Sequence, residues 1–299
     1  MDGFINVFKD TGLASNSALT KIKKIIRVKK AGFLGTLDPV ASGILPVALG
    51  RATKLLRFFE DSQKTYRATL RFGRETDTQD STGKVTKEGP VPDEAKREEL
   101  EKLFAAFTGE IKQLPPMFSA KKVDGERLYN IARKGGHVER DEKNVTVHSI
   151  KLEEFTGETA VFTAVVSKGT YIRALCEDIG RAFGYPAHMG ELTREAVHNF
   201  TTKDCVTLEQ LSEQRDDPDR WLLPPDYPLM FLPKFDAGVK DKNDLSNGMP
   251  VQWNGETFGY VRLYDSDGNF FGVGKGDHII KKVLPEKIIL SPARKEVSA

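Results

Sequence analysis

Long apolar runs, cysteine pairs and a secretory leader are all missing from this 299-residue sequence. No stretch approaches about 18 consecutive apolar residues, so we expect no transmembrane helix. The first ten residues, MDGFINVFKD, carry acids where a signal peptide has basic residues. The two cysteines, Cys176 and Cys205, are too few for a disulfide framework and fit a reducing compartment. These absences predict a soluble protein of the cytoplasm.

Signals for metals and nucleotide cofactors are also missing. The five histidines are scattered, and none lies at zinc-ligand spacing from another His or Cys. Neither a P-loop nor a dinucleotide-binding glycine pattern occurs, so we expect no cofactor. With 45 basic and 43 acidic residues, the net charge is only +2. Any nucleic-acid binding must therefore come from local charge asymmetry.

One acid stands alone in the segment GFLGTLDPVASG, residues 32–43. Gly35 tolerates positive φ, and Pro39 disfavours the α region for the residue before it. We therefore expect Asp38 on a fixed, non-helical turn. Asp before Pro is common in turns, so this residue is either a turn former or a functional carboxylate.

The residues before this acid are basic. Apolar residues recur at helical spacing after Ser15, a candidate N-cap, and predict an amphipathic helix. No acid occurs between Asn16 and Leu37, where the basic residues are Lys21, Lys23, Lys24, Arg27, Lys29 and Lys30. Such a face is either simply solvated or brings a polyanion toward Asp38.

The next segments predict further elements of a mixed α+β fold. Residues 44–49 are an apolar strand that Pro46 should interrupt, and a helix should open at Gly50. Residues 64–72 alternate as a strand does, with Tyr66 on the apolar face and Arg67 on the other. Tyr66 is either core or a ring on which a base stacks.

The polar segment RETDTQDSTG, residues 74–83, has two interpretations. Asp77 and Asp80 could hold a divalent cation, but such sites usually need more carboxylates. A turn-rich surface loop is favoured. Further along, residues 93–107 predict a helix, residues 113–136 a Pro-Pro loop followed by a short helix, and residues 145–155 and 159–166 two strands.

A last helix is expected in SKGTYIRALCEDIG, residues 167–180, with Arg173 in its first turn. A cation is unfavourable at that end of a helix dipole, so Arg173 needs an anion. That anion is a structural acid, a phosphate or Asp38. Beyond a Pro- and acid-rich connection at residues 216–233, short strands around the hairpin turn DSDGN indicate a small β module. We expect two domains, residues 1–235 and 236–299.

Taken together, these segments resemble the bacterial TruB family of tRNA pseudouridine synthases. The likeness runs over residues 3–290, and its motifs come in the family's order: GFLGTLDPVASG, LPVALGRATK, KTYRATLRFGRETDTQDSTG, PPMFSAKKVDGERLYNIARKG and SKGTYIRALCEDIG. The resemblance implies a central mixed or antiparallel sheet flanked by helices, and a C-terminal module similar to a PUA domain.

The resemblance also implies an activity, which is conversion of uridine 55 in the T-loop of tRNA into pseudouridine without a cofactor. It assigns catalysis to Asp38, base stacking and proton movement to Tyr66, and pairing with the aspartate to Arg173. Leu192 matches an apolar residue beside the base. The uridine must be flipped out of its loop. We also expect the enzyme to be a monomer. The further residues expected to contact its tRNA are Phe33, Tyr171, Lys64, Arg67, Lys121, Lys21 and Lys24.

The sequence departs from the family at a few positions. Phe33 stands where a histidine is usual, and it can stack or wedge but cannot hydrogen-bond a phosphate. Asp10, Phe118 and Thr193 replace the usual proline, tyrosine and arginine. Two other functions stay open: a non-catalytic tRNA chaperone of the same fold, and a glycosidase-like hydrolase, which normally needs a second carboxylate.

Overall fold

The computed structural model describes residues 1–118, 122–123, 126–127, 131, 136, 138–255 and 259–289. Nine of the described strands form one sheet, in the order β1-β3-β12-β4-β11-β10-β7, with β2 paired to β3 and β13 to β12. Only β3 and β12 run parallel, so the sheet is mixed, as predicted. The bounds are β1 Gly3–Lys9, β2 Ala31–Phe33, β3 Ser42–Leu49, β4 Lys64–Phe72, β7 Gly109–Gln113, β10 Lys143–Phe155, β11 Thr159–Val166, β12 Ala187–Val197 and β13 Phe200–Thr201.

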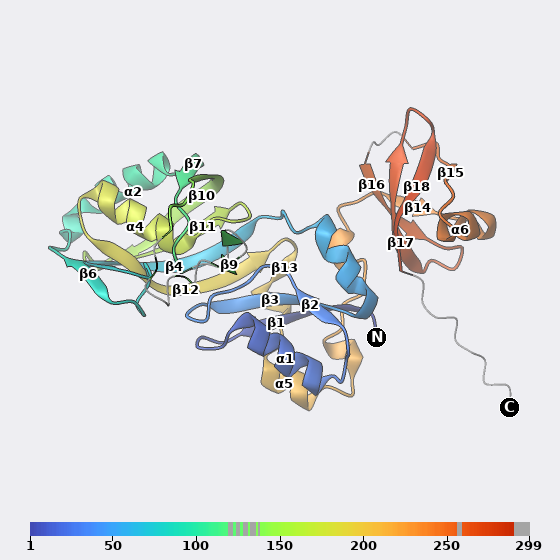
Figure 1. Ribbon diagram of the computed structural model, residues 1–299, viewed down its shortest axis with the longest axis horizontal. Coiled ribbons are helices and arrows are strands. Elements are labelled where there is room, and N and C mark those ends of the chain that lie inside the picture. Colours follow the sequence, from blue (N-terminus) through green and yellow to red (C-terminus); the bar gives the residue numbers. More distant parts are fainter. Residues whose placement is uncertain are drawn as a thin grey trace.

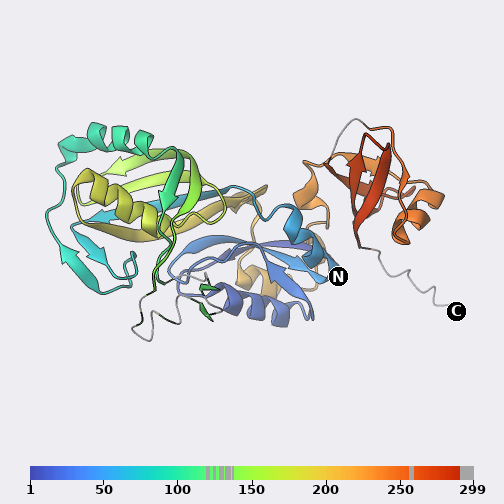
Figure 2. The same cartoon turned by 45° about the horizontal axis from the view of Figure 1, so that its top comes forward.

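Helices cover the sheet in two groups (Figures 1 and 2). Helices α2 (Arg97–Ala106) and α4 (Ile172–Phe183) lie together over the half that holds β4, β10 and β11. Helices α1 (Ser15–Ile25) and α5 (Leu208–Glu213) lie together at the β1 end. The alternation predicted for β4 is confirmed, because its apolar face is buried with the inner face of α4. No described helix is long and apolar enough to span a membrane.

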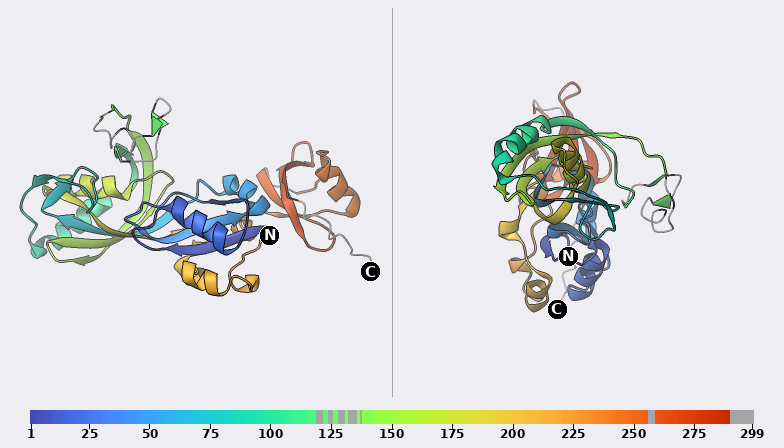
Figure 3. Two further views of the ribbon diagram at one scale, coloured as in Figure 1. Left: turned by 60° about the horizontal axis from the view of Figure 1, so that its bottom comes forward. Right: turned by 90° about the vertical axis from the view of Figure 1, so that its left-hand side faces the viewer.

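A second sheet lies beyond the 3-10 helix η1 (Gly50–Phe58), at one end of the long axis (Figures 1 and 3). Its order is β14-β16-β17-β18-β15, and α6 (Val239–Ser246) packs against it. The predicted hairpin is confirmed in β16 and β17. The bounds are β14 Lys234–Asp236, β15 Val251–Gln252, β16 Gly259–Tyr264, β17 Phe270–Asp277 and β18 Lys282–Ile288.

Short elements complete the described chain. Two small ladders pair β5 (Arg74–Thr76) with β6 (Val85–Glu88), and β8 (Lys122–Val123) with β9 (Glu126–Arg127). The other 3-10 turns are η2 Glu94–Lys96, η3 Thr202–Asp204, η4 Pro218–Arg220 and η5 Tyr227–Leu229. The helix predicted over residues 93–107 is η2 followed by α2. The short helix predicted near residues 128–132 falls mostly outside the described residues.

Pro46 does not interrupt β3, contrary to the prediction. It pairs with Asn6 of β1, and its carbonyl oxygen accepts a 2.9 Å hydrogen bond from Leu34 N, just past the end of β2. The N–H and C=O of a strand residue point to the same side. The donor that Pro46 lacks would therefore point to the edge of β3 that faces Leu34, so its absence removes no hydrogen bond between β3 and β1.

Candidate functional site

Buried cations hold the loop that carries Asp38, between β2 and β3. Arg194 of β12 donates from Nη1 and Nη2 to the carbonyl oxygen of Gly35, at 3.1 Å each, and from Nε to that of Ile44, at 2.9 Å. Gly35 has φ of +67°, which glycine adopts without strain. Lys9 is also fully buried, and its Nζ donates to three backbone carbonyls, including the one of Ala41. Asp38 is therefore displayed on a fixed, non-helical turn, as predicted.

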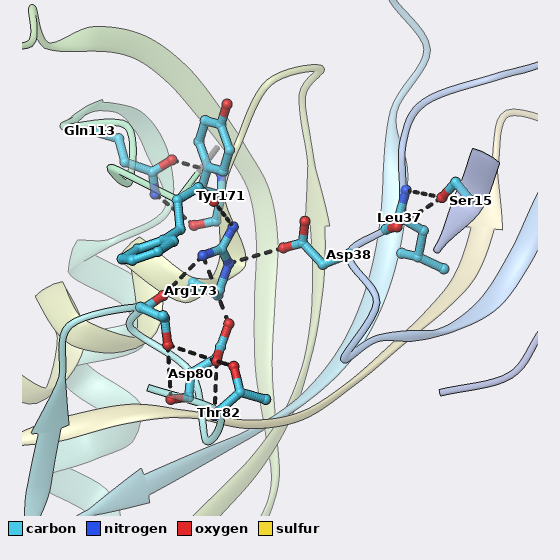
Figure 4. A network of polar contacts seen from close by, with 10 residues as sticks. Ser15, Leu37, Asp38, Asp80, Thr82, Gln113, Tyr171 and Arg173 are labelled. Atoms are coloured by element: carbon cyan, nitrogen blue, oxygen red, sulfur yellow. Dashed lines mark hydrogen bonds and ion pairs between the residues drawn. The ribbon is translucent and has the colours of Figure 1, made fainter. Parts of the chain in front are cut away.

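Ser15 fastens the residue just before Asp38. Its prediction as an N-cap is wrong, because Ala14 is the N-cap of α1 and makes no side-chain capping bond. Instead, Ser15 Oγ accepts a hydrogen bond from Leu37 N at 2.9 Å and donates one to Leu37 O at 2.8 Å (Figure 4). The helix thus fixes the loop rather than its own first turn.

The anion that faces Arg173 is Asp38. Arg173 is the second residue of α4, after the N-cap Tyr171, and its Nε lies 2.9 Å from Asp38 Oδ2. The arginine side chain is 5% exposed and the aspartate side chain 39%. Arg173 also donates to the carbonyl oxygens of Thr78 and Phe118, at 2.9 Å each. The two carbonyl oxygens fix the buried guanidinium, and the guanidinium in turn determines where the Asp38 carboxylate lies. Part of that carboxylate remains open to a substrate.

Asp80 is a second carboxylate beside Arg173. The prediction that this segment is a surface loop is wrong for Asp80, because its side chain is buried. Asp80 is 4% exposed, and its Oδ2 lies 3.8 Å from Arg173 Nη1. Its Oδ1 accepts hydrogen bonds from the Thr78 hydroxyl and from the backbone and hydroxyl of Thr82. In Figure 4, Arg173 lies between Asp80 and Asp38. Asp80 therefore shapes the loop that gives Arg173 one of its acceptors.

A cavity of about 480 Å³ opens beside the ion pair. This volume falls within the range of about 300–1,000 Å³ found for small-molecule sites. The predicted site residues that line the cavity are Asp38, Tyr66, Arg173, Phe33, Leu192, Tyr171 and Lys64. Tyr66 and Leu192 come from the neighbouring strands β4 and β12, and both are largely buried. Apolar side chains thus lie beside the Asp38–Arg173 pair, an arrangement that suits a flat, uncharged base next to a carboxylate.

The remaining predicted contact residues lie elsewhere. Arg67 points from the opposite face of β4, and its Nε bonds Glu153 Oε2 at 2.8 Å. Lys21 and Lys24 are exposed on α1 and do not line the cavity. Lys121 lies outside the described residues.

Lys64 brings a buried ammonium to the cavity wall. Burial above all, and then the charge of Arg194, lowers the pKa of Lys64 to about 8. Burial and Arg194 likewise lower the pKa of Lys9 to about 8. Positive charge is thus concentrated behind the Asp38 loop, in a protein of almost balanced net charge.

Two family models match the chain. The TruB family pseudouridylate synthase N-terminal domain matches residues 23–172, and the tRNA pseudouridylate synthase B C-terminal domain matches residues 173–230. The chain belongs to the TruB family.

Curated relatives in this family match over most of their length. A protein named tRNA pseudouridine synthase B from Geobacillus kaustophilus is 41% identical over 83% of this chain and 90% of its own. Proteins of the same name from Bacillus pumilus and Pseudomonas fluorescens are 35% and 38% identical, over 98% and 97% of this chain and 97% and 96% of their own.

Two solved structures have a fold similar to that of this chain. A chain in the structure of an H/ACA RNP bound to a substrate RNA containing 2′-deoxyuridine superposes with a TM-score of 0.74 at 25% identity, covering 97% of this chain and 85% of that chain. A chain of a Cbf5-Nop10-Gar1 complex gives a TM-score of 0.69 at 25% identity, with coverage of 97% and 84%. The pseudouridine synthase fold predicted from the sequence is confirmed.

In the TruB chain, the cavity places the Asp38 carboxylate against the Arg173 guanidinium. A carboxylate can attack an electrophilic carbon or stabilise the positive charge that develops at an anomeric carbon. The adjacent guanidinium, 2.9 Å away, orients that carboxylate. Among the residues that the structure describes, no group of three or more metal-ligating side chains comes together.

The sequence did not single out Asp80, Arg194 or Lys9 as parts of the site. Asp80 had a local signal, because threonines stand two residues before and after it and can donate to its carboxylate. Arg194 and Lys9 gave no such signal. Their partners are carbonyl oxygens far away in the chain, and only the folded sheet brings them together.

Proposed function

We propose that this TruB-family enzyme converts uridine 55 in the T-loop of tRNA into pseudouridine. Its tRNA pseudouridine synthase activity follows from the family match and from relatives of that name that are 35–41% identical over most of the chain. The single observation that best supports the site assignment is the Asp38–Arg173 ion pair, half open to a cavity of nucleotide size.

In this proposal the uridine leaves its loop and its base enters the cavity against Tyr66 and Leu192. Flipping a base costs a few kcal/mol, which phosphate contacts offset. The bond between N1 and C1′ breaks, the base turns, and C5 bonds to C1′. The hydrogen on C5 is lost to water as N1 gains one, so the isomerisation balances without an outside reactant. Asp38 acts at C1′, at the base, or through a glycal route, and Arg173 holds its carboxylate.

The division of the chain into two domains is part of the same proposal. Residues 1–235 form the catalytic part and residues 236–299 a PUA-like RNA-binding module, whose sheet takes its first strand, β14, from across that boundary. We further propose that the enzyme acts as a monomer in the cytoplasm, on the T-arm.

The position of the product tests this proposal. Full-length tRNA treated with the enzyme would be derivatised with a carbodiimide that marks pseudouridine and read by primer extension. We expect one new stop, immediately 3′ of position 55, and none when that uridine is replaced by cytidine. Modification at another position, with position 55 untouched, would contradict the proposed target while leaving the pseudouridine synthase activity in place.

A further inference from the structure

Among the residues that the structure describes, Lys168 is the exposed cation that lines the Asp38 cavity. It lies in the loop between β11 and α4, and its side chain is 46% exposed. The other two cations that line the cavity, Lys64 and Arg173, are each more than nine-tenths buried. Arg173 is bonded to Asp38 and two carbonyls, and Lys64 Nζ donates to Ser62 O. Of these three cations, Lys168 is the one that an incoming RNA strand reaches first.

Two carboxylates on the cavity rim bind Lys168. Its Nζ lies 2.9 Å from Asp61 Oδ1 and 3.3 Å from Glu60 Oε1, both in the segment after η1. The two acids are 84% and 52% exposed. Exposed ion pairs contribute only about 0–1 kcal/mol, so a phosphate can displace them without a large penalty.

Further ammonium groups lie close to Lys168. The charge of Lys168 is felt at Lys64, deeper in the cavity wall. The next residue, Gly169, has φ of +84°, and a Cβ placed on it would lie 2.5 Å from Lys143 Nζ. Lys143 thus lies beside the loop that carries Lys168, and a phosphate bound at Lys168 would reduce the repulsion between Lys168 and Lys64.

We propose that Lys168 binds a phosphodiester of the RNA strand next to the nucleotide in the cavity, and that Glu60 and Asp61 hold its ammonium until the RNA displaces them. The two acids then repel any strand that does not place a phosphate at Lys168, so they favour correctly seated RNA over other RNA. This inference rests on the proposed function, since it takes the strand around the reacting uridine as the ligand.

Lys168→Gln tests the contact in the full-length enzyme with a T-arm stem-loop. We expect Kd and KM to rise about tenfold and the slope of log Kd against log salt to fall by about 1. A matched control is Lys102→Gln, an exposed lysine on α2 that does not line the cavity, which should leave both measurements near the wild-type values. Both side chains are exposed, so thermal unfolding should be unchanged in either variant.

Neutral methylphosphonates placed one at a time along the RNA locate the contact. One position near the target uridine should weaken binding of the wild type about tenfold and have no added effect on Lys168→Gln. An equal loss in both proteins at every position would overturn the proposal.

The rim acids give an opposite and independent readout. The double variant Glu60→Gln, Asp61→Asn should bind both the stem-loop and an unrelated single-stranded RNA several-fold more tightly, because the lysine is released and two negative charges are gone. The control Glu213→Gln changes an exposed acid on α5 and should do neither. Unchanged or weaker binding by the double variant would contradict the displacement of the acids.

Failure of this inference and failure of the proposed function are distinguishable. If the wild type modifies position 55 while Lys168→Gln binds normally, only the role of Lys168 is wrong. If the wild type modifies no uridine in the T-arm, the proposed target itself is wrong.

Discussion

Arg173 connects two carboxylates that play different parts. Asp38 is open to the cavity, whereas Asp80 is buried and already accepts three hydrogen bonds from its own loop. A buried guanidinium is stable only when its charge and donors are matched, and here two carboxylates and two carbonyls match them. Asp80 is therefore a positioning residue, which acts on Asp38 through Arg173.

Asp80→Asn should lower kcat about tenfold, which corresponds to about 1.4 kcal/mol, with a smaller effect on KM. The amide keeps the size of the side chain but removes the charge beside Arg173. Single-turnover assays with saturating RNA measure this directly. Asp77→Asn is the matched control, because Asp77 lies in the same loop and is exposed, and its side chain accepts only the Lys84 N–H among the described hydrogen bonds. Equal losses in the two variants would mean that Asp80 matters only for folding of the loop.

Lys64 should make RNA binding depend on pH. Its pKa is lowered to about 8 from an ordinary value of 10.5, so the cavity loses a positive charge as the pH rises through about 8. Between about pH 8 and pH 10.5, Lys64 binds more protons in the unfolded chain than in the folded one, so its contribution to the free energy of unfolding rises with pH. We expect wild-type Kd to rise several-fold between about pH 7 and pH 9, and Lys64→Arg to keep its affinity over that range. Identical profiles for the two proteins would assign the titration to another group.

A substitution of Phe33 tests whether the side chain at this edge of the cavity takes part in RNA binding. It ends β2 and lines the cavity, and no hydrogen bond can form from its ring to RNA. Phe33→His should keep base flipping and product formation but change Kd for the stem-loop by a few-fold, since imidazole adds a donor. Unchanged affinity and unchanged rate would show that the residue at this position is not part of RNA binding.

At the scale of elements, β12 is the strand that joins the sheet to the active loop. It pairs with β4 on one side and β3 on the other, so Arg194 lies beside the start of β3 and reaches the loop. The bonds of Arg194 lie before and after Asp38 in the chain, at Gly35 and Ile44. Loss of this side chain should loosen both ends of the loop.

Arg194→Met should lower the free energy of unfolding by about 3 kcal/mol, because it leaves buried carbonyl oxygens without donors. It should also lower kcat, even at temperatures where the variant is fully folded. Urea unfolding and single-turnover rates check the two effects. Arg67→Met is the control, since that arginine pairs with Glu153 at the surface and should lose less than about 1 kcal/mol. A stable Arg194→Met enzyme with normal kcat would contradict the proposed positioning role.

Periodic elements were predictable from the sequence, and long-range polar contacts were not. The strand at β4 and the helix at α4 have burial patterns that follow directly from their spacing of apolar residues. Local preferences predict that Ser15 caps a helix and that Pro46 interrupts a strand. In the structure, hydrogen bonds to residues outside their own elements decide the roles of both. Asp80 was misread because its burial depends on Arg173, which is nearly a hundred residues away.

At the scale of the whole molecule, the C-terminal sheet packs onto the helix that forms one edge of the cavity. Phe58 and Tyr260 stack edge to face with centroids 4.9 Å apart, and Arg57 pairs with Glu286. Leu56 of the same helix lines the cavity. RNA held by the C-terminal module would therefore lie near the mouth of the site while the chemistry stays with Asp38, so binding and catalysis should be separable.

The most direct test of that account measures release of tritium from C5 of uridine in a labelled T-arm stem-loop, for the wild type and for Asp38→Ala, with RNA binding measured alongside. Bonding C5 to C1′ must expel the label. We predict release by the wild type, no release by Asp38→Ala, and similar Kd for both. Release that persists in Asp38→Ala, or binding without release by the wild type on both the stem-loop and full tRNA, would contradict the central role of Asp38; the second result would favour an RNA chaperone.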